Sequence, residues 1–236
     1  MTVASTRQPE PISISQMLTL MRQLRSKAGI KIETPQRIIE RNVHDRIEAL
    51  GLGNPGEYFN LLEDSLGARA EWLALIDLLS VKETRFFRQP AAMDAVASEV
   101  QARISRGQKR PLTVWSAGCS TGQELYSIGM VIESLRLCRA PELDWYGIGT
   151  DISFRAISEA QRGIYPEPAV TNIPGDYRDR YLDEKLGGRR IVTADLRART
   201  HFFHSNLLHV DGAPFADFNI IFCQNVLIYF ERDRQR

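Results

Sequence analysis

The segment Val-Trp-Ser-Ala-Gly-Cys-Ser-Thr-Gly-Gln-Glu, which begins at Val114, constrains the fold more than any other part of the chain. Its apolar start is typical of a buried strand, Gly118 and Gly122 permit backbone conformations that other residues rarely adopt, and helical periodicity resumes at Glu124. A turn of this kind leaves unpaired backbone amides at the start of the helix, facing whatever lies above the strand. The dinucleotide fingerprint G-x-G-x-x-G is not matched, since three residues separate the two glycines. The segment therefore predicts a nucleotide-type cofactor site that is not built for a nicotinamide, with an ordinary glycine-bearing connection as the alternative.

Strands and helices alternate from Arg110 onward, which is typical of a doubly wound parallel sheet in an α/β fold. The expected strands are residues 112–116, 145–150, 201–204 and 219–223, and the expected helices are residues 124–137 and 155–162. Between Tyr165 and Thr200 the pattern is weaker, but the two glycines before Arg189 predict a hairpin. We therefore expect a small antiparallel β insertion in the parallel sheet.

Residues 12–80 are expected to be entirely helical. The expected helices are residues 14–26, residues 36–50 with Thr34 as cap and Pro35 as first-turn proline, a helix opened by Asn54-Pro55, and residues 72–79. On the second of these helices, Arg37 and Arg41 share a face in which basic residues are in excess. The other basic residues near this face are Arg22, Arg25, Lys27, Lys31 and Arg46. A solvated helix face is one interpretation, and docking onto an acidic protein surface is the other.

The composition is that of a globular protein with a full core, since 43% of the 236 residues are hydrophobic. No run of about 18 uncharged apolar residues occurs and the first residues form no apolar stretch, so we expect no signal peptide, no membrane insertion and a cytoplasmic location. Three cysteines without C-x-x-C spacing and four scattered histidines predict reduced thiols and no metal site. A net charge of +1 argues against a protein that coats nucleic acid.

Small or polar residues follow each of the four expected strands, where ligands bind in open α/β sheets. They are Gly118 with its neighbours, Asp151, Ser205-Asn206 and Gln224-Asn225. A carboxylate after the second strand can accept hydrogen bonds from two ribose hydroxyls, which favours Asp151 as a ribose ligand. The alternatives are that Asp151, in competition with Ser153, caps the next helix, and that Asn206 and Asn225 only shape turns. Because four strands share the pattern, we expect their ends to form one site.

The segment from Ser80 to Arg88 precedes the sheet and combines two aromatic residues, Phe86 and Phe87, with two polar ones. Thr84 and Arg88 are spaced by one helical turn, and we expect the segment to fold over the cofactor as a lid. Arg88 offers a planar guanidinium fork that suits a carboxylate. The alternative is a surface arginine whose stem packs on the two aromatic rings.

Four motifs stand out in this order along the chain: Thr-Arg-Phe-Phe-Arg, Trp-Ser-Ala-Gly-Cys-Ser-Thr-Gly-x-Glu, Gly-Thr-Asp-Ile-Ser and Cys-Gln-Asn-Val-Leu-Ile-Tyr-Phe. Together they closely resemble the chemotaxis receptor methyltransferases (CheR family), over roughly residues 15–236. The resemblance implies transfer of a methyl group from S-adenosylmethionine to glutamate side chains of chemoreceptor cytoplasmic helices, with S-adenosylhomocysteine as the other product. It also implies an N-terminal helical domain at residues 1–80, the lid motif and a linker at 81–110, and a Rossmann-like class I methyltransferase domain at 111–236 with the β insertion at about 166–200.

The resemblance assigns roles to individual residues. The cofactor-binding residues expected on this basis are Thr84, Arg88, Gly118, Glu124, Asp151 as ribose ligand, Asn206, Leu207, Asn225 and Val226. A glutamate carboxylate is already a nucleophile at neutral pH, so the enzyme must supply alignment rather than a strong base. We expect Arg88 to hold a carboxylate, either that of the cofactor's methionine end or that of the substrate glutamate, and Tyr229 to line the methyl-transfer site. With a receptor as partner, Arg37 and Arg41 are the expected docking residues.

Three features depart from the family pattern. Lys82 stands where the lid motif often has asparagine, which puts one polar contact to the cofactor in doubt. Gln123 and Leu125 replace the commoner glutamate and proline on either side of Glu124. The sequence stops at Arg236, whereas the family continues through another helix and a final antiparallel strand pair, so we expect a C-terminally truncated domain.

Two other functions are compatible with the sequence. One is a non-catalytic module that binds S-adenosylmethionine and docks on receptors. The other is a small-molecule or nucleic-acid methyltransferase, because fold does not fix function. Against a nucleic-acid substrate, residues 224–227 read Gln-Asn-Val-Leu rather than Asn-Pro-Pro-Tyr or Asp-Pro-Pro-Tyr. We expect a monomer that acts on a chemoreceptor.

Overall fold

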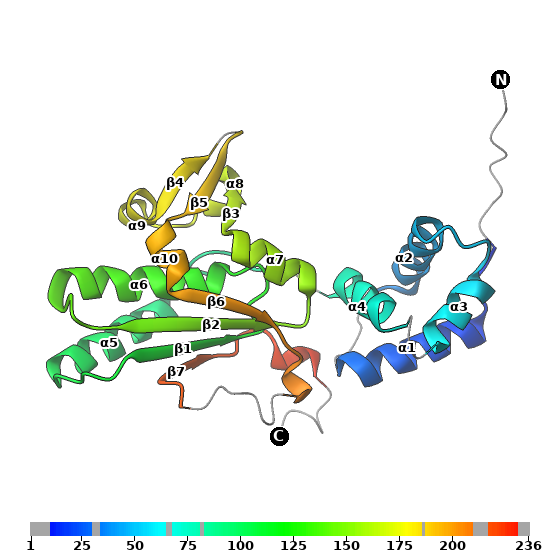
Figure 1. Ribbon diagram of the computed structural model, residues 1–236, viewed down its shortest axis with the longest axis horizontal. Coiled ribbons are helices and arrows are strands. Elements are labelled where there is room, and N and C mark those ends of the chain that lie inside the picture. Colours follow the sequence, from blue (N-terminus) through cyan, green and yellow to red (C-terminus); the bar gives the residue numbers. More distant parts are fainter. Residues whose placement is uncertain are drawn as a thin grey trace. The chain divides into compact units, whose positions relative to one another are not determined.

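A computed structural model describes residues 10–29, 34–64, 68–80, 83–185, 187–209 and 217–230 of the chain. By their internal contacts these residues form two compact units (Figure 1). The first contains the described residues up to Ser80 together with Ile228–Phe230, and the second contains the described residues from Glu83 to Leu227.

The first unit contains the helices that the sequence predicts. They are α1 (Ile14–Ala28), α2 (Gln36–Ala49), α3 (Pro55–Glu63) and α4 (Ala68–Leu79). Ser13 begins α1 with a capping box, and Asn54 caps α3 ahead of a first-turn proline. The start of α2 differs from the prediction, because Pro35 rather than Thr34 occupies the N-cap position and no side chain caps this helix.

A buried carboxylate connects three of these helices. Glu71 of α4 accepts hydrogen bonds from Arg46 Nε at 2.8 Å, from Arg46 Nη2 at 2.7 Å and from the Tyr58 hydroxyl at 2.7 Å. Burial, followed by the hydrogen bond to Glu71, raises the pKa of Tyr58 far above its usual value, so the phenol stays protonated and donates. Arg46, which the sequence placed among the basic residues near the docking face, is therefore engaged within the helical unit.

The second unit contains a parallel sheet with strand order β6-β2-β1-β7. The strands are β1 (Leu112–Ala117), β2 (Trp145–Asp151), β6 (Thr200–His204) and β7 (Ile220–Phe222), and every pairing between them is parallel. Helix α6 (Gln123–Arg139) follows β1, and α7 (Phe154–Arg162) follows β2. The predicted α/β fold with a parallel central sheet is confirmed.

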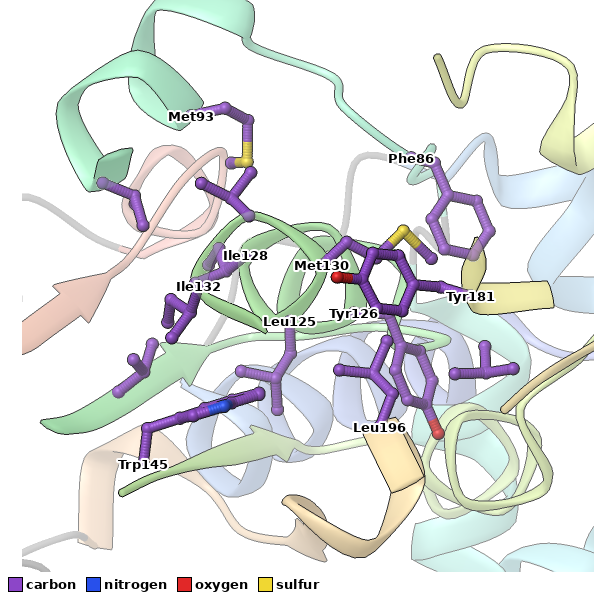
Figure 2. Packing of buried hydrophobic residues seen from close by; sticks show 14 of the residues in the cluster. Phe86, Met93, Leu125, Tyr126, Ile128, Met130, Ile132, Trp145, Tyr181 and Leu196 are labelled. Atoms are coloured by element: carbon purple, nitrogen blue, oxygen red, sulfur yellow. The ribbon is translucent and has the colours of Figure 1, made fainter. Parts of the chain in front are cut away.

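Helix α6 supplies much of the core of this unit, because its first ten residues are nearly all buried. Figure 2 shows Leu125 of α6 pointing toward Trp145 of β2 and Tyr126 toward Leu196 of α10 (Ala194–Ala198), while Met130 points to the opposite side of the helix, toward Phe86. These side chains are almost completely shielded from solvent. Such close packing fixes the start of α6, and with it the turn that precedes the helix.

The predicted antiparallel insertion is also confirmed, as a three-stranded sheet of order β3-β5-β4. Its strands are β3 (Ile164–Pro166), β4 (Leu182–Lys185) and β5 (Arg189–Val192), and its helices are α8 (Glu167–Val170) and α9 (Gly175–Tyr181). Figure 1 shows this sheet set apart from the parallel sheet, beyond α6 and α10. The two glycines of the predicted hairpin, Gly187 and Gly188, both have left-handed backbones, while Leu186 lies outside the described residues.

Helix α5 (Pro90–Ser105) was not predicted, since residues 81–110 were expected to be a lid motif and a linker. It begins at a proline in the first helical position and packs on α6 through Met93, Val96 and Val100. The remaining short elements are the 3-10 helices η1 (Leu207–His209) and η2 (Leu227–Tyr229). In the described part of the chain, no helix combines the length and the apolar character needed to cross a bilayer.

Candidate cofactor site

The four parallel strands bring their carboxyl ends to one edge of the sheet. Gly118 follows β1, Asp151 ends β2, Asn206 follows β6 and Asn225 follows β7. The chain runs from β1 outward through β2 to β6 and then returns to β7 on the other side of β1. This reversal makes the β1–β7 boundary a topological switch point, where ligands bind in open α/β sheets.

The turn after β1 approaches the turn after β7 very closely. A Cβ atom on Gly118, whose φ is 76°, would lie 2.4 Å from Val226 Cγ2, so only glycine fits this position. The Gly118 and Cys119 amides both donate to the Thr150 carbonyl, at 2.8 and 2.9 Å. The turn is therefore fixed to β2 and, with the Val226 side chain packed beside Gly118, forms a cradle at the end of β1.

Asp151 is oriented by two backbone amides. Ser120 N–H donates to its Oδ2 at 2.9 Å, and Ser153 N–H donates to its Oδ1 at 2.9 Å. Ser153 is the N-cap of α7, with its hydroxyl accepting from Ala156 N–H at 3.0 Å, so the alternative interpretation of Asp151 as the cap is wrong. The two amides therefore orient the carboxylate from both of its oxygens. Its role as ribose ligand remains a prediction.

Glu124 lies in the first turn of α6 and is largely shielded. Ser116 Oγ donates to its Oε1 at 2.7 Å. Burial raises the pKa of the Glu124 carboxyl above its usual value, while the Ser116 hydrogen bond and the positive charge of Arg88 act in the opposite direction. The charge of Arg88 thus acts on Glu124, while the Arg88 guanidinium itself donates a hydrogen bond to the Glu83 carbonyl at 3.0 Å.

Residues 83–89 form an extended strap with a turn rather than a helix, so the expected one-turn helical spacing of Thr84 and Arg88 is wrong. Phe86 is fully buried and packs edge-to-face on Tyr165 of the insertion, with ring centroids 4.9 Å apart. Phe87 has a φ of 49°, which breaks any helical path. Arg88 Nη1 donates to the Glu83 carbonyl at 3.0 Å, which closes the strap on itself.

Asn206 and Asn225 shape the turns after β6 and β7, as the alternative interpretation of these two asparagines expected. Asn206 Oδ1 accepts from Leu208 N–H at 3.0 Å, and Asn225 has a left-handed φ of 56°. Leu207 begins η1, and Val226 covers Gly118. These contacts give the two asparagines a local role, and cofactor binding by the four residues remains a prediction.

The other predicted residues lie elsewhere. Arg37 and Arg41 are exposed on α2, and Tyr229 lies in η2, all in the first unit. Lys82 lies outside the described residues. The roles of Arg37, Arg41 and Tyr229 remain predictions.

Sequence reasoning missed two serines that hold the site residues in place. Ser116 is fully buried and orients Glu124, and its position two residues after buried Val114 on β1 marks it as a polar group on the core face. Ser127, also fully buried, lies one helical turn after Glu124 and contacts the strap. The three cysteines are free thiols, and among the described residues no cluster of three potential metal ligands occurs.

Comparison with known proteins identifies related chains. Residues 82–236 match the model of the CheR methyltransferase, SAM binding domain. The chain is 30% identical to a chemotaxis protein methyltransferase of Borreliella burgdorferi, over 93% of this chain and 79% of that protein. It is 33% identical to the chemotaxis protein methyltransferase of Escherichia coli, over 89% of this chain and 72% of that protein. It is 34% identical to the probable biofilm formation methyltransferase WspC of Pseudomonas aeruginosa, over 91% of this chain and 50% of that protein.

Proposed function

The chain belongs to the CheR methyltransferase family, and from this premise we propose that it methylates glutamate side chains on the cytoplasmic helices of chemoreceptors. The product is a glutamate methyl ester, and S-adenosylhomocysteine is released. The names of the Borreliella burgdorferi and Escherichia coli relatives support a chemotaxis pathway. We further propose that the enzyme acts as a monomer in the cytoplasm, where these receptor helices lie.

The observation that carries the proposal is the cradle at the carboxyl edge of the parallel sheet. The chain contains a domain of the S-adenosylmethionine-binding type, and this cofactor has a ribose and a zwitterionic amino-acid end. Asp151 offers a fixed carboxylate for the ribose hydroxyls. Arg88 and Glu124 offer a cation and an anion for the carboxylate and the ammonium of the methionine end. Gly118 permits the left-handed turn that brings the ends of β1 and β7 together at this edge.

The remaining residues of the edge complete the proposed cofactor site. We assign Thr84 to the strap side, and Asn206, Leu207, Asn225 and Val226 to the two turns beside the cradle. When bound, the cofactor supplies an electrophilic methyl group on a positively charged sulfur. The substrate glutamate is ionised at neutral pH, so the protein must align its carboxylate and exclude water. We assign Tyr229 to the wall of the methyl-transfer site.

Receptor docking is assigned to the exposed arginines of α2. Arg37 and Arg41 are solvent-exposed, and exposed charges act mainly on the encounter with a charged partner. Charge reversal of both arginines to glutamate is expected to slow methylation of receptor fragments at low salt and to leave cofactor affinity intact. The matched control is charge reversal of exposed Arg106 and Lys109 in the loop after α5, which changes net charge equally. Equal methylation rates in the two double variants would mean that Arg37 and Arg41 form only a solvated helix face and do not dock the receptor.

The direct test is a transfer assay with methyl-labelled S-adenosylmethionine. Receptor cytoplasmic fragments, RNA and free small carboxylic acids are offered in parallel, and mild alkali then releases methanol from methyl esters only. We expect alkali-labile label on the receptor fragments. Cofactor binding in calorimetry without transfer to any acceptor would favour the alternative, a non-catalytic receptor-docking module.

A further inference from the structure

The strap at residues 83–89 contains a strained residue directly before Arg88. Phe87 adopts a left-handed φ of 49°, which an aromatic residue with a Cβ atom rarely does. Such a backbone is unfavourable for a residue with a Cβ atom and persists only where its surroundings over-determine it. Because Phe87 precedes Arg88, its conformation sets the direction in which the guanidinium leaves the chain.

Ser127 of α6 provides one restraint on this conformation. The Phe87 amide donates to Ser127 Oγ at 3.0 Å, and Ser127 Oγ in turn donates to the Gln123 carbonyl at 2.7 Å. Ser127 is fully shielded from solvent, so its hydroxyl is held in one place. The hydrogen bond therefore ties the strained residue to the first turn of the helix that carries Glu124.

The antiparallel insertion provides the second restraint. The Phe87 ring packs on Tyr177 of α9, with ring centroids 5.3 Å apart and an angle of 42° between the rings. The adjacent Phe86 is buried against Tyr165 of β3. Two consecutive aromatic residues of the strap are thus anchored on the insertion, and the next residue is Arg88.

We propose that Ser127 and Tyr177 are positioning residues, which hold the strap in its strained conformation so that Arg88 is kept near the start of α6, where its charge acts on Glu124. The inference deepens the proposed function, because it rests on the assignment of Arg88 to a carboxylate of the reaction. It gives the insertion a role at the reaction centre, since Tyr177 belongs to the insertion and not to the parallel sheet.

The test uses Ser127→Ala and Tyr177→Leu in the whole chain, with Ser98→Ala as the matched control. Ser98 makes the same hydrogen bond to a carbonyl four residues earlier on α5, to Asp94 at 2.9 Å, but is exposed on that helix. The first measurement is the NMR titration of the Glu124 carboxyl without cofactor. The charge of Arg88 acts to lower the pKa of this carboxyl, so Arg88→Ala is expected to raise the pKa, and releasing the strap in Ser127→Ala or Tyr177→Leu is expected to raise it in the same direction. Ser98→Ala is expected to titrate as the parent.

A double variant separates positioning from general damage to the fold. Ser127→Ala in an Arg88→Ala background is expected to add no further shift, because Arg88 is the group being positioned. In the transfer assay, kcat/KM is expected to fall about tenfold to a hundredfold in Ser127→Ala, the usual effect of a small misplacement. An unchanged Glu124 titration in Ser127→Ala, or equal additional shifts in both backgrounds, would overturn the proposal.

Two further outcomes are covered by the same design. If Ser127→Ala does not fold, Tyr177→Leu decides, since the half-buried tyrosine contacts the strap from α9 rather than from α6. If no acceptor is methylated at all, the proposed function fails, but the titration still reports whether Ser127 and Tyr177 keep the charge of Arg88 within reach of Glu124.

Discussion

Replacing Gly118 by alanine tests how closely the turns after β1 and β7 are fitted together. The added Cβ would lie 2.4 Å from Val226 Cγ2, whereas carbon atoms in ordinary contact are about 3.5 to 4.0 Å apart. The left-handed φ of 76° adds a backbone cost of about 1 to 2 kcal/mol for any residue with a Cβ atom. Overlap in a packed region adds about 1 to 3 kcal/mol. We therefore expect Gly118→Ala to lower the free energy of unfolding by about 2 to 5 kcal/mol.

Gly107 provides the control that separates the two contributions. Its φ is also left-handed, at 59°, but a Cβ atom there would meet nothing within 4 Å. Gly107→Ala should therefore show the backbone cost alone, about 1 to 2 kcal/mol. In a Val226→Ala background the overlapping methyl groups are gone, so Gly118→Ala should cost about 1 to 3 kcal/mol less than in the parent.

The assay is urea unfolding of the cofactor-free chain. The measured quantity is the shift between variants in the urea concentration at half-unfolding, with the dependence of the unfolding free energy on urea unchanged. Omitting the cofactor matters, because ligand binding would add its own stabilisation to the difference between variants. Two results would refute the reasoning: a Gly118→Ala variant as stable as Gly107→Ala, or a cost of Gly118→Ala that Val226→Ala does not reduce. Either result would mean that Gly118 and Val226, in the turns after β1 and β7, are not in close contact.

Three further predictions concern buried or oriented carboxylates. Glu71→Ala removes the partner of Arg46 from the helical unit and is expected to lower the free energy of unfolding by about 3 kcal/mol. A loss below about 1 kcal/mol in urea unfolding would contradict this expectation. Because burial raises the pKa of Glu124 in the folded state, this group contributes stability below its usual pKa of 4.5 that is lost as pH rises through the folded value. Urea unfolding should therefore show the free energy of unfolding of Glu124→Gln rising relative to that of the parent between about pH 4 and about pH 8. A difference between the two proteins that does not change with pH would contradict this expectation. Asp151→Asn places an amide group against a backbone N–H and is expected to weaken S-adenosylhomocysteine binding, measured by calorimetry, by about 1 to 3 kcal/mol. An unchanged affinity would show that Asp151 is not part of the site.

The sequence predicted the parallel sheet because each strand is a short apolar run that ends in a small or polar residue. The same pattern predicted that Gly118 and Asp151 meet at one edge, since parallel strands carry their ends to the same side. Helix α5 escaped prediction because its apolar stripe is narrow and is interrupted by alanines and polar residues. Its first-turn proline, Pro90, was the one signal available.

The contacts that orient the site residues were beyond sequence reasoning. The amide of Ser120 reaches Asp151 only because its φ of 49° turns the chain back toward β2. The hydrogen bond between Phe87 and Ser127 joins residues 40 positions apart and depends on a backbone conformation that no sequence pattern marks for an aromatic residue. Helical spacing of Thr84 and Arg88 was for this reason the wrong expectation.

The pairing of β1 with β7 also determines when the cofactor can first take part in folding. Thr113 N–H donates to Asn219 Oδ1 across 106 residues, so the strand that completes this edge is synthesised long after β1. Until β7 has left the ribosome, β1 is an edge strand with unpaired backbone groups on that side. Val226 is then also missing, and the cofactor has only part of the proposed site to bind. A ligand stabilises only a form that it can bind, so the cofactor would stabilise the completed domain and contribute little to the growing chain.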